Sequence, residues 1–369
     1  MRRITSALVC TNHLFMWAGS ELVAIEMAEE LLARGIRTDI FATLADRDFL
    51  HGIFGDRVQV HDRAEAVDLR SYDLVYAQHH VLPLILHANL ARGPIDAGPF
   101  VVWNHLSPFE PLAAPGPFVE SALADVILAN SEETRAMLTG LGPPFDTARL
   151  WPNPAPRAFA TTPALTGTGN LLAVSNHRTP EALRAFDILE REGTPVRRIG
   201  RMDQSERVRP RHLAAARGVI TIGKTVQYAL RAGRAVYCYG PHGGPGWLSS
   251  ENFEAARKTN FSGRSHPRKK TAETIAQELV CGLPDAARFT LELDPSGHNF
   301  CLGLLVDDLL GEAATLLSDP AWHYRRHELM NLDEFQTRTT MEANLCKCVK
   351  KFFLQSRKQH TYPRSRANA

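Results

Sequence analysis

Short apolar runs alternate with helical patterns along residues 1–150. Residues 4–10 form an apolar run that predicts a buried β-strand, and similar runs follow at 38–43, 58–61, 74–78, 100–104 and 126–129. After the first run, apolar residues recur at helical spacing from Ser20, a favourable N-cap, to about Arg34. Such alternation of strands and helices is typical of a parallel, doubly wound sheet.

A proline-rich segment interrupts this pattern and predicts a linker. It reads Trp151-Pro-Asn-Pro-Ala-Pro156, and three prolines so close together cannot continue a helix or a central strand. The alternation then restarts, with strands predicted at 171–175, 196–200, 219–222 and 235–239 and helices at 180–192 and 225–231. From about residue 271 the pattern is helical. We therefore expect a Rossmann-like unit at 1–155, a second at 156–320, and a closing helix with a basic tail at 321–369.

Composition and charge narrow the class of protein. Hydrophobic residues are 44% and charged residues 22%, which is typical of a globular chain, and no apolar run approaches the roughly 18 residues that span a bilayer. The six cysteines form no C-x-x-C pair, so we interpret them as reduced thiols of a cytoplasmic protein. Acids outnumber arginines in residues 1–150, whereas only basic charges follow Glu342, so no uniformly basic nucleic-acid surface is indicated.

The basic tail has two interpretations. From Lys347 to Lys358 it mixes lysines with apolar residues, which suits peripheral contact with an anionic membrane at its inner face. The alternative is a closing helix with a solvated basic face.

Lys224 is the first lysine of the chain, and it stands in a phosphate-binding pattern. The stretch Gly218-Val-Ile-Thr-Ile-Gly223-Lys224-Thr225 matches G-x-x-x-x-G-K-[ST]. In a P-loop the four variable residues form the loop, but here they are a β-branched run that favours a strand. We interpret the stretch as a short strand-to-helix turn whose lysine and helix N-terminus bind an anion. A surface turn with a solvated lysine is the alternative.

Four stretches share order and spacing with one known family: Ala18-Gly-Ser-Glu-Leu-Val23, Ala124-Asp-Val-Ile-Leu-Ala-Asn130-Ser131, Trp151-Pro-Asn-Pro154 and Ala229-Leu-Arg-Ala-Gly233-Arg-Ala-Val236. In these the chain resembles the GT-B-fold glycosyltransferases of the retaining group-one superfamily. Residues 174–177, 223–230, 237–247 and 260–264 resemble members from bacterial surface-polysaccharide clusters. The resemblance implies an α/β fold with two Rossmann-like domains facing a central cleft and C-terminal helices packing across.

The same resemblance implies a function. A hexosyl- or related transferase would move a sugar from a nucleotide-sugar donor to a glycan or lipid-linked acceptor, with retention and without a metal. The nucleotide sugar is a cosubstrate, and no other cofactor is expected. The family's usual pair of glutamates is missing, because the corresponding places hold Ile220 and Tyr228.

The candidate site residues follow from these motifs. We expect Lys224 to stabilise the leaving diphosphate and His105, which follows a predicted strand, to face the sugar by resemblance, a structural histidine being the alternative. The expected donor-binding residues are Gly19, Ser20, Asn176, Arg178, Lys224, Thr225, Val226, Gln227, Gly243 and Gly244. The expected sugar or acceptor residues are Asn12, His13, Asn104, His105, Trp247 and Glu251. No metal-ligand constellation is expected.

Three rival functions remain open. A nucleotide-sugar epimerase shares the two-domain architecture but needs no acceptor. A P-loop ATPase or kinase would need Mg²⁺ with its nucleotide. A non-catalytic subunit that kept the GT-B fold is the third, and the missing glutamates keep this alternative open.

Overall fold

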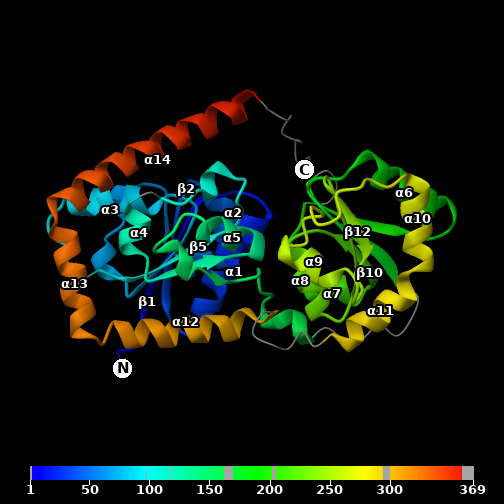
Figure 1. The fold of residues 1–369 in the computed structure, drawn as a ribbon, viewed down its shortest axis with the longest axis horizontal. Helices are drawn as coiled ribbons and strands as arrows, with labels where there is room; N and C mark the ends of the chain where they lie inside the picture. Colours follow the sequence, from blue (N-terminus) through cyan, green and yellow to red (C-terminus); the bar gives the residue numbers. More distant parts are fainter. Residues whose placement is uncertain are drawn as a thin grey trace.

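The computed structural model describes residues 2–96, 98–116, 118–161, 169–201, 205–293 and 300–359. It has two α/β units side by side, with the last helices wrapped around the first unit (Figure 1).

The first unit is built on a parallel sheet in the order β3-β2-β1-β4-β5-β6-β7. Its strands are β1 (Ser6–Leu14), β2 (Arg37–Ala45), β3 (Val60–His61), β4 (Leu74–Gln78), β5 (Phe100–His105), β6 (Val126–Ala129) and β7 (Arg149–Leu150). Its helices are α1 (Gly19–Ala33), α2 (Arg47–Phe54), α3 (Leu82–Leu90), α4 (Val119–Leu123) and α5 (Glu132–Thr139). Successive side chains of β1 point into opposite cores, since Val9 packs on one face of the sheet and Leu8 on the other.

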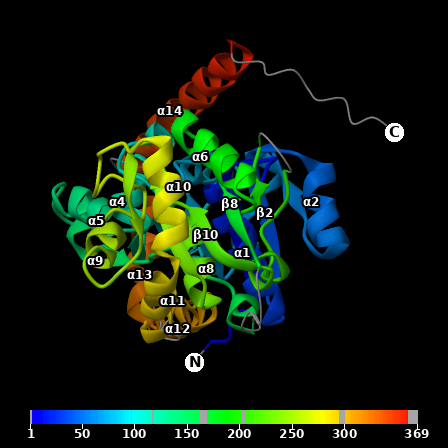
Figure 2. The ribbon, with the colours of Figure 1, turned by 90° about the vertical axis from the view of Figure 1, so that its right-hand side faces the viewer.

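The second unit has a five-stranded sheet in the order β12-β11-β10-β8-β9. Its strands are β8 (Asn170–Val174), β9 (Val196–Ile199), β10 (Ala216–Thr221), β11 (Ala235–Gly240) and β12 (Gly243–Trp247), and only β12 is antiparallel to its neighbour. Its helices are α6 (Pro180–Arg191), α7 (Pro210–Ala214), α8 (Lys224–Arg231), α9 (Phe253–Lys258), α10 (Ala272–Cys281) and α11 (Leu283–Glu292). Figure 2 shows α6 and α10 in front of β8 and β10, where they share a core with that sheet.

The chain crosses between the units twice, and the two crossings touch. The backbone N–H of Ala155 donates to Phe300 O at 3.0 Å, and the N–H of Leu302 donates back to Ala155 O at 3.0 Å. The helix α12 (Leu302–Leu316) then packs Val306 and Leu309 into the core of the first unit, although the predicted second unit extended to residue 320. Helices α13 (Pro320–Asn331) and α14 (Asp333–Gln359) complete the wrap.

Two predictions from the sequence about the overall architecture are confirmed. The two doubly wound sheets and the returning C-terminal helices are both present. The glycine-rich stretch at 243–247 forms the edge strand β12.

Candidate functional site

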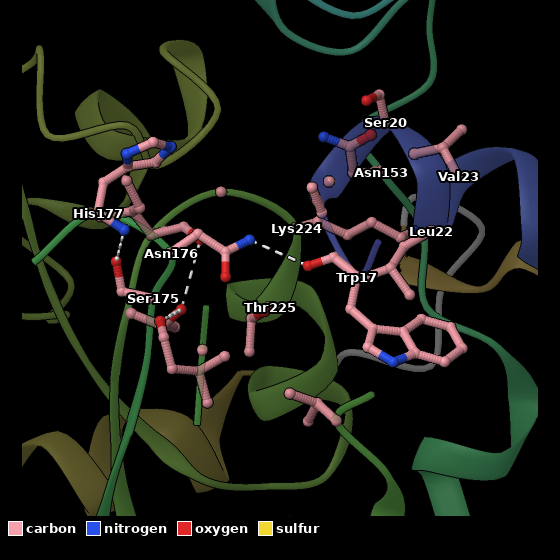
Figure 3. Close-up of a pocket in the computed structure, with 18 of the residues that line it drawn as sticks. Trp17, Ser20, Leu22, Val23, Asn153, Ser175, Asn176, His177, Lys224 and Thr225 are labelled. Carbon is pink, nitrogen blue, oxygen red and sulfur yellow. Dashed lines mark hydrogen bonds between the residues drawn. The ribbon is translucent and has the colours of Figure 1, made fainter. Parts of the chain in front are cut away.

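A cavity of about 280 Å³ lies between the two units (Figure 3). The second unit lines it with residues that follow the carboxyl ends of three neighbouring strands: Ser175 after β8, Gly200 after β9 and Ile222 after β10. Strands β9 and β10 flank β8 on opposite sides, so the cavity lies where the strand order reverses. Open α/β sheets bind ligands at this kind of position.

Two helices begin at this cavity, one from each unit. Gly19 is the first residue of α1 and Lys224 the first residue of α8, and both line the cavity, as do Ser20 and Thr225. The N–H groups of a first helical turn have no intrahelical partner and carry a partial positive charge. Two such N-termini facing one cavity make it favourable for an anion.

The turn before α8 confirms the strand-to-helix interpretation of the lysine motif. Strand β10 runs through Val219 to Thr221, so these residues cannot form a loop around phosphate. Gly223 follows with φ 62°, a backbone conformation that favours glycine, and caps α8. The pattern is therefore not a P-loop in this fold.

Lys224 is buried and paired, so the alternative of a solvated surface lysine is wrong. Its Nζ lies 2.8 Å from Glu26 Oε2 of α1 and donates to the Pro154 carbonyl at 3.3 Å. The side chains of Lys224 and Glu26 are 6% and 1% exposed. This ion pair joins the two units at the edge of the cavity.

Two more residues of the second unit reach Glu26. Tyr228, at the place of the family's second glutamate, donates its hydroxyl to Glu26 Oε1 and stacks on Phe159 with ring centroids 4.2 Å apart. Arg207 Nη2 lies 3.5 Å from Glu26 Oε1. Burial, followed by the charge of Glu26, raises the pKa of Tyr228 well above its usual value, so the phenol stays a donor. We call Glu26, Lys224, Tyr228 and Arg207 the Glu26 cluster.

Asn176 also bridges the units at the cavity. Its Nδ2 donates to the carbonyl of Trp17 at 3.0 Å, as Figure 3 shows, and its Oδ1 accepts from the backbone N–H of Arg201 at 3.0 Å. Arg178, also expected at the donor site, instead donates from Nη2 to the Ile199 carbonyl at 3.2 Å and does not line the cavity.

Two expected donor ligands on α8 are occupied or turned away. The N–H of Val226 donates to the Gly223 carbonyl at 3.0 Å, so it is not available to a phosphate. Gln227 is 1% exposed and does not line the cavity.

His105 is buried at the end of β5 with both ring nitrogens bound to protein. Nδ1 lies 3.0 Å from the Ala113 carbonyl, and Nε2 contacts the Glu120 carboxylate. Burial opposes protonation, but Glu120 and the Ala113 carbonyl outweigh it, so the pKa of His105 is raised. His105 does not line the cavity between the units, and these contacts match the structural alternative.

The other expected sugar residues of the first unit gather at the same sheet edge. Asn12 Oδ1 accepts from Thr43 Oγ1 at 2.8 Å, and His13 Nε2 lies 3.6 Å from Glu21 Oε1. Asn104 donates its Nδ2 to the hydroxyl of Tyr76. None of the three lines the 280 Å³ cavity, although Asn12 lines a smaller one of about 80 Å³ beneath α14.

The expected residues on and after β12 lie away from the cavity. Trp247 donates its indole N–H to the Glu278 carbonyl at 2.7 Å and packs edge-on against Tyr237, so both of these contacts lie within the second unit. Gly243 and Gly244 are buried in the strand, and Glu251 is exposed outside the cavity lining.

Sequence reasoning missed four residues that matter here. Trp17, Asn153 and Glu206 line the cavity, and Glu26 neutralises Lys224. Glu206 is the carboxylate of the second unit in this lining, and it lies 3.1 Å from Arg197. Two of the four had a signal in the sequence: Asn153 stands in the proline-rich linker motif, and Glu26 is an acid within the apolar pattern of α1.

The residues that the structure describes contain no group of three or more His, Cys, Asp or Glu residues placed to hold a metal ion. None of their helices is both long and apolar enough to cross a bilayer.

The comparisons with known proteins concern the fold. No family model matches the chain, and no curated protein matches it significantly. HepE from Anabaena, in a crystal structure with UDP and glucose, is similar with a TM-score of 0.52 and 14% identity over 85% of this chain and 100% of HepE. A second HepE structure, with UDP, has a TM-score of 0.51 and 13% identity over 86% of this chain and 100% of HepE.

An epimerase is also among the similar structures. UDP-GlcNAc 2-epimerase from Neisseria meningitidis, bound to UDP-GlcNAc, has a TM-score of 0.48 and 11% identity over 85% of this chain and 100% of the epimerase. The likeness to HepE shows the fold alone, and the GT-B fold that the resemblance implied is confirmed.

Proposed function

We propose that the protein is a glycosyltransferase that moves a sugar from a nucleotide-sugar donor to a glycan or lipid-linked acceptor. One observation carries the proposal. A cavity between two Rossmann-like units is faced by two helix N-termini and a lysine, at the carboxyl edge of the second sheet. HepE, which shares the fold, has been crystallised with UDP and glucose, so UDP is the first ligand to test.

The chemistry of sugar transfer makes this arrangement useful. When the bond between the sugar and the diphosphate breaks, negative charge develops on the leaving oxygen, and preorganised donors lower the barrier. Lys224 would supply a full positive charge, Thr225 a hydroxyl, and Gly19 and Ser20 the backbone N–H groups of α1. The diphosphate would then be neutralised by protein groups, which supports transfer without a metal.

The acceptor would approach from the first unit. Asn12, His13 and Asn104 lie at the carboxyl edge of that sheet, and their polar groups suit sugar hydroxyls. We assign His105 to holding the segment around Ala113 in place, because its ring already has two protein partners. Retention of stereochemistry is proposed from the family resemblance only.

A non-catalytic GT-B subunit is the second candidate. Tyr228 occupies the place of a family glutamate, and Lys224 is already paired. Such a subunit would bind or ignore the nucleotide but would never turn the donor over.

Thermal-shift measurements with UDP and with UDP-, GDP-, CMP- and TDP-sugars test the donor site. A ligand at about 100 times its Kd stabilises a protein by about 2.7 kcal/mol, which raises Tm by several degrees. We expect such a rise for at least one nucleotide, unchanged by EDTA. In Lys224→Ala the affinity falls at least about tenfold, because a charge-assisted contact is worth about 1.5–3 kcal/mol. Lys258→Ala, an exposed lysine on α9, is the matched control.

The outcomes separate the candidates. If no nucleotide stabilises the wild type, the donor site is wrong. Equal stabilisation of Lys224→Ala would show that Lys224 does not hold the phosphate. Transfer of the donor sugar to a component of an acceptor mixture, with release of the nucleoside diphosphate, indicates a transferase. A changed sugar on the nucleotide without acceptor indicates an epimerase, and binding without turnover indicates the non-catalytic subunit.

A further inference from the structure

The cation that the proposed donor site needs is already neutralised in this structure. Glu26 lies two turns along α1 from Gly19, beneath the same helix N-terminus that faces the cavity. Its Oε2 lies 2.8 Å from Lys224 Nζ, and both side chains are almost fully buried. A phosphate in the cavity must therefore compete with a carboxylate for this lysine.

The remaining contacts of Glu26 make such an exchange feasible. Removing one partner of a buried ion pair normally strands the other as an uncompensated charge. Here Oε1 accepts from the Tyr228 hydroxyl and lies 3.5 Å from Arg207 Nη2, whereas Oε2 faces Lys224. Glu26 would keep a hydrogen bond and a cation after Lys224 turned to a ligand.

Arg207 is well placed to remain behind. Its guanidinium donates to both carboxylate oxygens of Glu29, at 2.6 and 2.7 Å, and lies 5.9 Å from the centroid of the Trp17 ring. Burial opposes its charge, but the hydrogen bond to Glu29 and the charge of Glu26 outweigh it, so its pKa is raised. The guanidinium is thus fixed against α1 and does not follow Lys224.

We propose that Glu26 is an internal competitor of the donor diphosphate, which holds Lys224 while the site is empty and exchanges it for phosphate when the donor binds. This inference rests on the proposed function. The exchange favours ligands with two phosphate groups. A single phosphate group interacts less strongly with Lys224, so it compensates for less of the energy lost when the ion pair with Glu26 breaks. The return of Lys224 to Glu26 also assists release of the nucleoside diphosphate product.

Isothermal titration with UDP, on the full chain, tests the exchange in Glu26→Gln. The amide keeps the shape of the side chain and can still accept from Tyr228, but it leaves Lys224 without its carboxylate. We expect UDP to bind this variant about tenfold more tightly than the wild type. Glu30→Gln removes one charge from the same helix, where Glu30 pairs with Arg34 and not with Lys224, and should bind UDP as the wild type does.

The outcomes distinguish this inference from the proposed function. If the wild type binds UDP and Glu26→Gln binds it equally or more weakly, the exchange is wrong and the donor site stands. An equal gain in UDP affinity in Glu30→Gln would also overturn the exchange, since the change in net charge alone would then explain the gain in Glu26→Gln. If neither the wild type nor any variant binds UDP, the proposed donor site itself is wrong. If Glu26→Gln does not fold, Glu26→Asp should give a smaller gain in the same direction, and unchanged affinity there overturns the exchange.

Discussion

Individual buried charges in this protein are neutralised by residues far away in the sequence. Lys224 meets Glu26 across the two units, and Glu342 of α14 meets His80 of the first unit at 3.4 Å. Glu342 also accepts from the backbone N–H of Phe118 at 2.6 Å, at the start of α4. Because each carboxylate accepts from or pairs with several groups, single substitutions at these residues should measurably change the stability of the protein.

Protonated His80 should stabilise the docking of α14 in a pH-dependent way. Burial opposes its charge, but contacts with Cys346 and Glu342 outweigh it and raise the pKa of His80 from 6.5 to about 10. A raised folded pKa gives stability that is complete below pH 6.5 and is lost as pH rises through about 10. Relative to His80→Gln, the wild type should be more stable by on the order of 2 kcal/mol at pH 6.

Denaturant unfolding of both proteins from pH 6 to pH 10 measures this difference. His51→Gln, on the exposed side of α2, controls for the loss of an imidazole. A difference between His80→Gln and wild type that stays constant over this range would contradict the prediction.

At the scale of elements, glycines decide how closely the second sheet packs. A Cβ on Gly244 would lie 2.1 Å from the Cys238 carbonyl oxygen, and one on Gly243 would lie 2.8 Å from that of Arg268. These glycines therefore let backbone approach backbone within the protein. Their expected role as donor-binding residues remains a prediction.

Gly244→Ala should destabilise the second unit by about 3 kcal/mol or more, because the contact is with backbone and cannot relax through a side chain. Gly52→Ala is the matched control. Gly52 lies in α2 with open space around its Cβ position, so alanine there should stabilise by about 0.5–1 kcal/mol. Urea unfolding of the three proteins measures both effects, and a neutral Gly244→Ala would refute the packing argument.

At the scale of the whole molecule, polar side-chain contacts join the two units. Asn153 Nδ2 donates to Asn260 Oδ1 at 3.0 Å, near the Glu26 cluster. Arg264 Nε donates to Glu133 Oε1 at 3.2 Å, and its guanidinium lies 4.7 Å from the ring centroid of Phe109. Contacts of this kind between domains are individually weak, so their loss should change the orientation of the units before it changes their folding.

Arg264→Ala should loosen the arrangement of the two units. The ion pair with Glu133 is about a quarter exposed, so its loss is worth about 1 kcal/mol, or about a fivefold change in the population of open forms. Small-angle X-ray scattering should show a larger radius of gyration without ligand. Arg257→Ala, whose partner Glu254 lies in the same helix, should leave the radius unchanged. An identical radius for both variants would mean that Arg264 does not hold the units together.

The sequence by itself determined most strands of the two sheets and, to within one residue, the start of α8. Residues 74–78 and 126–129 are strands as predicted, whereas the N-cap of the first helix is Ala18 and not Ser20. The β-branched Val219–Thr221 run correctly predicted a strand before the lysine, against the P-loop pattern. These features depend on hydrogen bonds and side-chain periodicity among near neighbours, which a single sequence carries.

Only the tertiary structure decided what the candidate site residues touch. The partner of Lys224, the enclosure of His105 by Glu120, and the return of α12 to the first unit depend on how distant elements dock. Helix and strand patterns specify which face is buried but not which element covers it. A buried charge takes its partner from that docking. The sequence could therefore mark Lys224 as a candidate ligand for an anion, but it could not identify Glu26 as the partner of Lys224.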